Sequence, residues 1–336
     1  MKNLDVNSLL ELGLKYHQEN KFDQAIYYYD EVIKKNKENL QANLYLGIVY
    51  AQQKKFTEAK KQFQKILNIN PSNFDALNNL ALVHRDLNEI DKSIDCFKKV
   101  IEVNSNFITP YNNLSILYQN IKKYLEAEKI LIKALDIEPN NLETKLNLAI
   151  LYKDIFKFEK SKKLFLEILD KAPNNLIALI NYGNLLKNTE NKKESEESFK
   201  RAISINPKYF PAYNNLLVLY ERTNQNDKLK ELIDKAEIYF KNNETLKLFY
   251  GHYLYKVEDF KSSINILKNI KFSDKEYLKE KLRNLLLAKN YDKIEEADTA
   301  FEYFQKTNDI SFRYKDQNID KSKALNIISN RINYFK

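Results

Sequence analysis

The sequence predicts an all-α fold, a right-handed superhelical solenoid of about eight helix-turn-helix units with a helical cap at its C-terminal end. Three observations predict this fold. The four glycines, Gly13, Gly47, Gly183 and Gly251, are separated only by multiples of 34 residues. Apolar residues recur at helical spacing within each 34-residue unit, and four of the six prolines occupy the same place in it.

Small residues dominate two places in the repeat. We number each unit so that Gly13 is repeat position 8, which puts the unit starts near residues 6, 40, 74, 108, 142, 176, 210 and 244. Position 8 then holds Gly13, Gly47, Ala81, Ser115, Ala149, Gly183, Leu217 and Gly251, and position 20 holds Ala25, Ala59, Ser93, Ala127, Ser161, Ser195, Leu229 and Ser263. Two antiparallel helices approach closely only where small side chains meet, so these positions predict the helix crossings. In the seventh unit, where both residues are leucine, we expect a wider helix separation.

Larger residues surround the small ones at helical spacing. Positions 4, 7, 8 and 11 lie on one face of a first helix, and positions 17, 20, 24 and 27 on one face of a second helix. The prolines at position 32, which lack a backbone N–H, predict a break before the next unit; they are Pro71, Pro139, Pro173 and Pro207. The repeat array is therefore expected to span residues 6–275.

The order of residues within the units closely resembles the tetratricopeptide repeat family. In the first unit, Leu12, Gly13, Tyr16, Ala25 and Tyr29 follow the family's pattern of Leu, Gly, Tyr, Ala and an aromatic residue. The resemblance implies a superhelix whose first helices line the concave side and whose second helices line the convex side. It also implies a protein–protein interaction scaffold or adaptor, which binds an extended peptide or a partner helix in the concave groove.

Composition and charge leave one other class of partner open. The net charge of +9 is compatible with a nucleic-acid-binding solenoid, but the lysines are scattered among acids, which favours a protein or peptide partner. No apolar run approaches the ~18 residues of a membrane span. The N-terminal residues carry acids within their apolar stretch, which argues against a signal peptide, so we expect a cytoplasmic protein. Cys96 is the only cysteine, which excludes an internal disulfide.

The sequence contains no pattern typical of a catalytic or metal site. All four glycines fall within predicted helices, so no glycine-rich phosphate loop is formed. The histidines His17, His84 and His252 fall in different units, without a second histidine or a cysteine at ligand spacing. We therefore predict a non-enzymatic chain that holds no metal and no cofactor.

One row of amides distinguishes the expected concave face. Position 6 is asparagine in five consecutive units, and we call these residues the asparagine ladder: Asn79, Asn113, Asn147, Asn181 and Asn215. Position 5 adds Asn78, Asn112 and Asn214. A primary amide offers a donor and an acceptor together, so it can pair with the N–H and C=O of a peptide unit whatever its side chain. These residues are predicted to bind an extended peptide, and a purely structural role, with bonds to neighbouring units or water, is the alternative.

Aliphatic residues are expected beside the ladder. Position 9 supplies an apolar floor, formed by Leu82, Ile116, Ile150 and Val218. The ladder is similar to the one in the O-linked N-acetylglucosamine transferases, whose repeats share the Tyr-Asn-Asn-Leu sequence found here at residues 111–114 and 213–216. That resemblance implies binding to polypeptide backbone.

The repeat pattern weakens after residue 275, and residues 276–336 are predicted to be a degenerate ninth hairpin and an amphipathic last helix. The ninth hairpin is expected over 276–290 and 294–307, with Leu285 at position 8, Ala297 at position 20 and Phe301 at position 24. The last helix, 319–335, has an apolar face that needs a cover, and the capping hairpin, a missing domain and a partner are the candidates. That face consists of Ala324, Ile327, Ile328, Ile332 and Phe335.

The segment from Ala300 to Asn308 loosely resembles the linker of bacterial tetratricopeptide sulfotransferases. This resemblance implies an alternative function. The chain would then be the substrate-recruiting region of a sulfotransferase or glycosyltransferase whose catalytic domain lies outside it.

Overall fold

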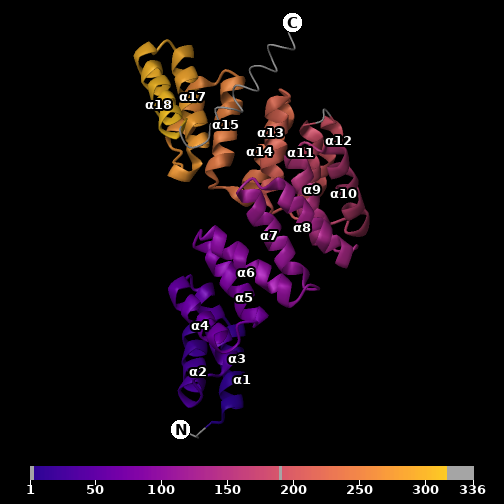
Figure 1. Cartoon of the computed structure of the whole chain (residues 1–336). Helices are drawn as coiled ribbons and strands as arrows, with labels where there is room; N and C mark the ends of the chain where they lie inside the picture. The colour runs from indigo at the N-terminus through magenta and orange to yellow at the C-terminus, as the bar shows by residue number, and fades with distance from the viewer. Residues whose placement is uncertain (1–3, 189–190, 316–336) are drawn as a thin grey trace. The chain divides into compact units, whose positions relative to one another are not determined.

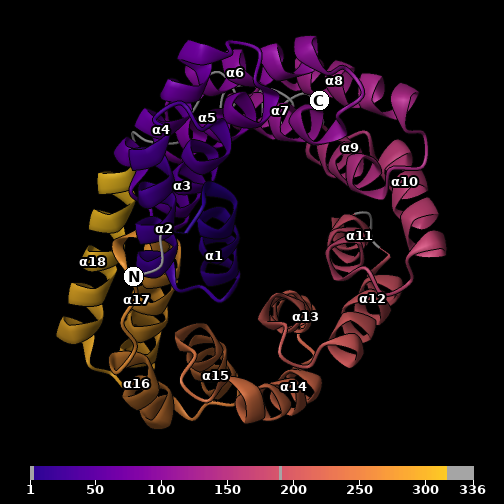
Figure 2. The ribbon, with the colours of Figure 1, turned by 90° about the horizontal axis from the view of Figure 1, so that it is seen from below.

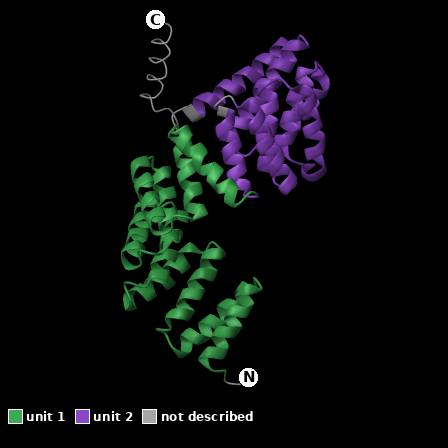
Figure 3. Cartoon of the chain, turned by 90° about the vertical axis from the view of Figure 1, so that its right-hand side faces the viewer, with its two compact units in different colours: residues 1–173 green, residues 174–336 purple. Residues whose placement is uncertain are grey.

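The structure is a computed structural model that describes residues 4–188 and 191–315. The described residues form eighteen α-helices and one short 3-10 helix, and no strand occurs among them (Figure 1). The chain divides into two compact units, unit 1 with residues 1–173 and unit 2 with residues 174–336 (Figure 3). The all-α helical solenoid predicted from the sequence is confirmed.

The helices follow the 34-residue period. In unit 1 the first helices of the hairpins are α1 (Val6–Gln18), α3 (Leu40–Gln52), α5 (Phe74–Asp86), α7 (Ile108–Asn120) and α9 (Leu142–Asp154). Their second helices are α2 (Phe22–Lys35), α4 (Phe56–Ile69), α6 (Ile90–Val103), α8 (Tyr124–Ile137) and α10 (Phe158–Lys171). Every first helix begins at repeat position 1 and every second helix at position 17.

Unit 2 continues the same order. Its first helices are α11 (Leu176–Asn188), α13 (Phe210–Arg222) and α15 (Glu244–Lys256), and its second helices are α12 (Lys192–Ile205), α14 (Asn226–Phe240) and α16 (Phe260–Lys268). A last hairpin follows, with the 3-10 helix η1 (Asp274–Glu276), α17 (Tyr277–Lys293) and α18 (Ala297–Lys315). In Figure 2, α11, α13 and α15 lie on the inner side of this unit and α12, α14 and α16 on its outer side. Within unit 1, α7 and α9 are likewise inside α8 and α10.

Position 8 is small because the side chain at position 24 of the same hairpin lies directly on it. A Cβ atom added to Gly13 would be 2.5 Å from Cε1 of Tyr29, and one added to Gly47 would be 2.6 Å from Cε1 of Phe63. Real Cβ atoms do not approach other atoms this closely. Glycine thus sets the distance between the two helices of the hairpin.

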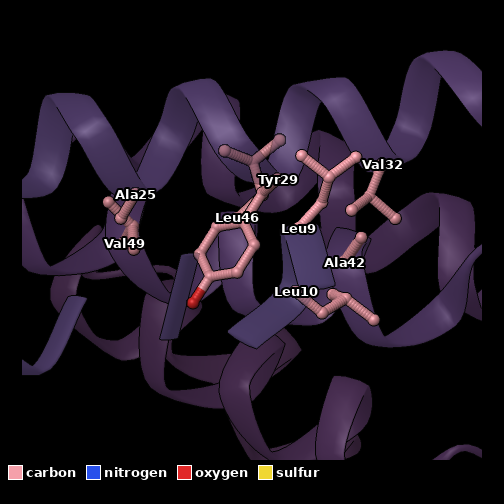
Figure 4. Packing of buried hydrophobic residues seen from close by; sticks show 8 residues of the cluster. All are labelled: Leu9, Leu10, Ala25, Tyr29, Val32, Ala42, Leu46 and Val49. Atoms are coloured by element: carbon pink, nitrogen blue, oxygen red, sulfur yellow. The ribbon is translucent and has the colours of Figure 1, made fainter. Parts of the chain in front are cut away.

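The side chain at position 24 is also covered by the next hairpin. Tyr29 is fully buried, and Figure 4 shows it packed with Leu46 in a cluster that includes Ala42 and Val49 of α3. These three residues of α3 occupy positions 3, 7 and 10. The same positions of α5 pack on Phe63. From the first hairpin to the eighth, every side chain at position 24 is at most 3% exposed.

The turn between the two helices of a hairpin has a recurring backbone conformation. Position 15 has a positive φ of 52° to 64° at Asn20, Lys54, Asn88, Lys122, Phe156, Asn224 and Glu258. The left-handed conformation ends the first helix and reverses the chain. Asparagine tolerates it better than most residues do, and three of these seven positions are asparagine.

The seventh hairpin is more open than the others, as predicted from its two leucines. Leu217 and Leu229 are buried at positions 8 and 20, with exposed fractions of 0% and 1%. Among the described hairpins, the two helices of this one, α13 and α14, are the least closely packed against each other. The helices have moved apart to accommodate the larger side chains.

The register predicted for the ninth hairpin was wrong by three residues. Ala297 and Phe301 are exposed, whereas Ala288 and Ala300 are buried at the helix crossing. The repeat pattern restarts with Leu287, Ala288 and Tyr291 at positions 7, 8 and 11, and the turn residue with positive φ is Glu295. Three additional residues between α16 and the crossing point in α17 cause the shift. The predicted helix at 319–335 lies outside the described residues.

Candidate functional site

Three residues of the asparagine ladder lie in unit 1. Asn79 is on α5, Asn113 on α7 and Asn147 on α9, and each side chain is half-buried. The three helices begin at the same repeat position, so the three side chains leave their helices at equivalent points. Each asparagine directly precedes a buried leucine at position 7, which packs the helix against its neighbours.

The other two ladder residues lie in unit 2. Asn181 is on α11 and Asn215 on α13, and both side chains are half-buried. α11 and α13 contact each other, as α7 and α9 do in unit 1. The next first helix, α15, has Phe249 at this position.

Several ladder amides bond to their own helix. Nδ2 of Asn79 donates to the backbone carbonyl of Asp75 at 2.9 Å, and Nδ2 of Asn215 donates to that of Pro211 at the same distance. Asn181 makes the equivalent bond to Ile177 at 3.0 Å. These bonds fix the orientation of each amide and use one of its two N–H groups. For Asn79 and Asn215, the second N–H and Oδ1 have no partner among the described residues.

Asn113 and Asn147 differ from these residues. Their side chains make no hydrogen bond within the described part of the chain, although both are only half-buried. An amide on a helix surface without a protein partner bonds to water, so both its donor and its acceptor can exchange water for a ligand.

The asparagines at position 5 are less accessible than the sequence suggested. Asn112 is only 2% exposed, so its side chain is not on the surface, and its inclusion among ligand-binding residues does not fit the structure. The Oδ1 atoms of Asn112 and Asn78 are buried without a hydrogen-bond partner within the described structure. Asn78 and Asn214 are half-buried.

The predicted apolar floor lies next to the ladder on the same helices. Leu82, Ile150 and Val218 are half-buried, and Ile116 is 40% exposed. Position 9 follows position 6 by three residues, so each aliphatic side chain lies about one helical turn from a ladder amide. The surface therefore alternates amides and aliphatic groups.

Charged residues near the ladder are paired with each other. Arg85 and Asp86 form an ion pair at 3.0 Å, and Lys153 and Asp154 approach to 3.5 Å. His17 bonds to Oε1 of Gln52 at 2.8 Å and so connects α1 to α3.

One residue pair beside the ladder was missed from the sequence. On α3, Nε2 of Gln41 donates to the hydroxyl of Tyr45 at 3.1 Å, which places a phenol at position 6, where the following units have asparagine, and an amide one turn before it. The signal was available, since positions 2 and 6 are one helical turn apart.

Family models confirm the identity of the repeats. Models described as tetratricopeptide repeat match residues 16–68, 74–107, 108–141 and 177–209. The chain is a tetratricopeptide repeat protein. Among curated proteins, none matches it in sequence. The resemblances to O-linked N-acetylglucosamine transferases and to sulfotransferases stay predictions.

Several solved structures share the fold of this chain. A tetratricopeptide repeat protein from Parabacteroides merdae matches with a TM-score of 0.60 at 18% identity, over 73% of this chain and 96% of that one. PilF of Pseudomonas aeruginosa matches with a TM-score of 0.53 at 19% identity, over 66% and 98%. A monomeric mutant of IFIT1 with m7Gppp-AAAA matches with a TM-score of 0.51 at 16% identity, over 89% and 80%. At these identities the likeness concerns the fold alone.

Hollows on this tetratricopeptide repeat protein recur with the repeat. One of about 270 Å³ lies among α12, α13 and α14, and one of about 380 Å³ among α4, α5 and α6. Both are lined by positions 25 and 28 of one hairpin and positions 7, 11, 19, 22, 23 and 26 of the next. Such a hollow is a product of the packing of successive hairpins, and it does not mark a unique site.

The described residues contain no group of His, Cys, Asp and Glu side chains that could hold a metal ion. His84 is buried and bonds to Glu89, as expected for a core residue. His252 approaches Glu221 at 3.4 Å. Burial raises the pKa of the Cys96 thiol, which disfavours its reactive thiolate form. Among the described helices, none contains an apolar stretch of the length that a membrane span requires.

Proposed function

We propose that this protein is an interaction scaffold whose first helices bind an extended peptide through the asparagine ladder. The observation that carries the proposal is the set Asn79, Asn113 and Asn147 in unit 1, three half-exposed amides at one repeat position on three successive first helices. Tetratricopeptide repeats in general support a scaffold that binds proteins.

The chemistry of the ladder favours recognition of the main chain. In Asn79, Asn113 and Asn147, the side-chain amide keeps at least one N–H and its Oδ1 for a ligand. Each amide can therefore pair with both the N–H and the C=O of a peptide unit. A helix asparagine provides this pairing whatever side chains the peptide has. The ladder is therefore suited to binding peptides that have many different sequences.

The position-9 residues supply the apolar part of the contact. Ile116 and Ile150 lie one turn beyond Asn113 and Asn147, so an extended peptide bound by the amides would place alternate side chains over them. Burying these aliphatic groups contributes roughly 25 cal/mol for each Å² removed from water. The amides then define the path of the chain, and the floor adds affinity.

The test uses peptides selected from a random library displayed on phage. Selected sequences are synthesised with a fluorescent label, and their binding to the full chain is measured by fluorescence anisotropy. A ladder variant carries Asn79→Ala, Asn113→Ala and Asn147→Ala. Each lost hydrogen bond costs roughly 0.5–1.5 kcal/mol, so we expect the affinity to fall about tenfold or more.

A matched control replaces three exposed amides on second helices of the same unit. The substitutions are Gln24→Ala, Gln64→Ala and Asn68→Ala, and we expect them to leave the affinity nearly unchanged. Circular dichroism confirms that both variants are folded. Equal affinity of the ladder variant, the control variant and the parent would reject the ladder as the peptide site.

A further inference from the structure

Four cations lie near the C-terminal ends of three successive first helices in unit 2. We call them the basic cluster, and its members are Arg222 on α13, Lys256 on α15, and Lys289 and Lys293 on α17. Arg222, Lys256 and Lys293 occupy position 13 of their hairpins, and Lys289 lies one turn before Lys293. All four side chains are exposed. α15 contacts both α13 and α17, so the cluster extends over adjacent helices.

The basic cluster forms no ion pair with the described residues. Lys256 bonds instead to Oδ1 of Asn224 at 3.1 Å. Glu221, which directly precedes Arg222, lies 3.4 Å from Nδ1 of His252. Unit 1 is different, because its cations at position 12 are paired with the aspartates that follow them at 3.0 and 3.5 Å. The charge of the basic cluster is therefore available to a ligand.

Most acids of the neighbouring turns make other contacts or lie beyond the helix ends. Asp259 caps α16, and Glu296 accepts a hydrogen bond from α18. Glu258 and Glu295 occupy the left-handed turns. Asp292 is exposed beside Lys293 and forms no ion pair with a described residue. The acids therefore interrupt the cluster without neutralising its cations.

Lys256 and Lys289 lie close to the same imidazole. Burial lowers the pKa of His252, Glu221 opposes this shift, and the positive charges of Lys256 and Lys289 lower the pKa further. Both ammonium groups act on one ring although they come from different helices. Two lysines that converge in this way can approach a single carboxylate of a ligand.

We propose that the basic cluster binds an extended acidic segment of a partner protein, with a carboxylate at about every third residue. Arg222 lies two helical turns beyond the ladder residue Asn215 on α13, so the proposal goes beyond the asparagine ladder and does not depend on it. Charge complementarity of this kind gives specificity and rapid association.

The spacing of the carboxylates follows from the spacing of the helices. Packed helices lie about 8–10 Å apart. An extended chain advances about 3.3 Å per residue, so three residues span the distance from one first helix to the next. Acids at i, i+3 and i+6 would then lie near the cations of α13, α15 and α17 in turn.

A nucleic-acid strand fits this surface less well. Glu221 and Asp292 lie among the cations, where they would repel a continuous row of phosphates. Separate carboxylates on a peptide can avoid them. Only Arg222 provides the guanidinium group that suits phosphate best.

The test uses two labelled peptides of serine and glycine with an amidated C-terminus. One has glutamates at i, i+3 and i+6, and the other has the same composition with three adjacent glutamates. Fluorescence anisotropy measures their binding to the full chain at about 10 mM salt, where charges interact over about 30 Å. We expect the spaced peptide to bind at least about threefold more tightly.

A triple variant removes one cation from each helix, with Arg222→Gln, Lys256→Gln and Lys293→Gln. Its affinity for the spaced peptide should fall about tenfold. The matched control loses the same net charge from second helices, with Lys193→Gln, Lys235→Gln and Lys261→Gln, all at exposed positions. We expect less than about a twofold effect, because these helices lie on the outer side of the unit (Figure 2).

Three results would overturn the proposal. The spaced peptide does not bind, or it binds no better than the peptide with adjacent glutamates. The two triple variants lose the same affinity, which would indicate a response to overall charge. Oligothymidylate binds the parent more tightly than the spaced peptide does and is lost in the cluster variant, which would indicate nucleic acid.

Cross-linking locates the bound peptide directly. A carbodiimide joins carboxylates to lysine amines, and mass spectrometry identifies the lysines that are modified. We expect the spaced peptide to label Lys256 and Lys289 at least about fivefold more than the control lysines Lys193, Lys235 and Lys261. Even labelling of all five lysines would also overturn the proposal.

Discussion

The hydroxyl of Ser195 donates a hydrogen bond of 2.7 Å to the backbone carbonyl of Gly183. The donor is at position 20 and the acceptor at position 8, so the bond joins the two helices of a hairpin at their crossing point. It recurs from Ser93 to Ala81, Ser161 to Ala149 and Ser263 to Gly251, at 2.7–2.8 Å. Serine at position 20 is therefore a polar link in the core as well as a small residue.

Removing this link should weaken its hairpin. We expect Ser195→Ala to lower the free energy of unfolding by about 0.5–1.5 kcal/mol, because the hydrogen bond is lost while the small size is kept. Ser204→Ala, which removes an exposed bond to the carbonyl of Arg201, is the control and should have little effect. Urea denaturation followed by circular dichroism measures both. If Ser195→Ala matched the parent, the bond would contribute nothing to stability.

The contact between Gly47 and Phe63 should make position 8 intolerant of large side chains. We expect Gly47→Leu to destabilise the protein by about 1–3 kcal/mol through overpacking. Adding Phe63→Ile recreates the pair of Leu217 and Ile233 found in the seventh hairpin and should restore part of the loss. Thermal unfolding by circular dichroism provides the comparison. A Gly47→Leu protein that unfolds like the parent would contradict the packing described above.

The turn at Phe156 should carry removable strain. Its φ is 62°, and its side chain is 77% exposed, so the ring does little to offset a left-handed backbone. Phe156→Asn introduces the residue found in three of the other turns and should stabilise the hairpin of α9 and α10 by up to about 1 kcal/mol. Phe156→Val should be no more stable than the parent. A destabilised Phe156→Asn variant in urea denaturation would disprove strain at this turn.

The pair of His84 and Glu89 should make the third hairpin sensitive to acid. Hydrogen bonds from Lys60 and from His84 lower the pKa of Glu89 to about 2, and burial lowers the pKa of His84 below its ordinary value of 6.5. The folded protein therefore binds fewer protons at both groups than the unfolded chain, and stability falls as the pH falls. The His84 contribution is present above pH 6.5 and is lost below it, and that of Glu89 is lost between pH 4.5 and about 2.

A substitution separates the two contributions. His84→Tyr introduces tyrosine at position 11, where the first two units have Tyr16 and Tyr50. It also removes the imidazole that titrates below pH 6.5. We expect the melting temperature of the variant to change less than that of the parent between about pH 7 and pH 5.5. Circular dichroism melting curves measure this difference. Parallel curves for the two proteins would show that His84 does not couple folding to pH.

The period of 34 residues was sufficient to predict where the helices begin, because Gly13, Gly47, Gly183 and Gly251 mark the same helix crossing each time. It was insufficient in the ninth hairpin, where three additional residues move the crossing from Leu285 to Ala288. A local signal of the insertion was present, since Leu287, Ala288 and Tyr291 repeat the leucine, small residue and tyrosine of positions 7, 8 and 11, but the fixed period pointed to Leu285. The burial of Ala288 and Ala300 identifies the register.

The candidate site was predictable in part for a related reason. Helix geometry shows that Asn112 and Asn113 lie at neighbouring points around the surface of α7. The sequence does not show which of the two side chains is covered, and the structure leaves Asn113 half-exposed while it buries Asn112. The hydrogen bond from Ser195 to Gly183 was missed because the sequence shows that serine is small but does not show which backbone carbonyl its hydroxyl reaches.

The central functional claim is that ladder amides bind the main chain of a peptide. The most direct test is to methylate, one at a time, the backbone nitrogens of a selected peptide and to measure its affinity for the full chain. Loss of one main-chain donor should weaken binding about three- to tenfold at the contacted units, whereas replacing single side chains by alanine should change it less. If methylation had no effect at any position, and one or two side chains accounted for the affinity, recognition of the backbone by the asparagine ladder would be contradicted.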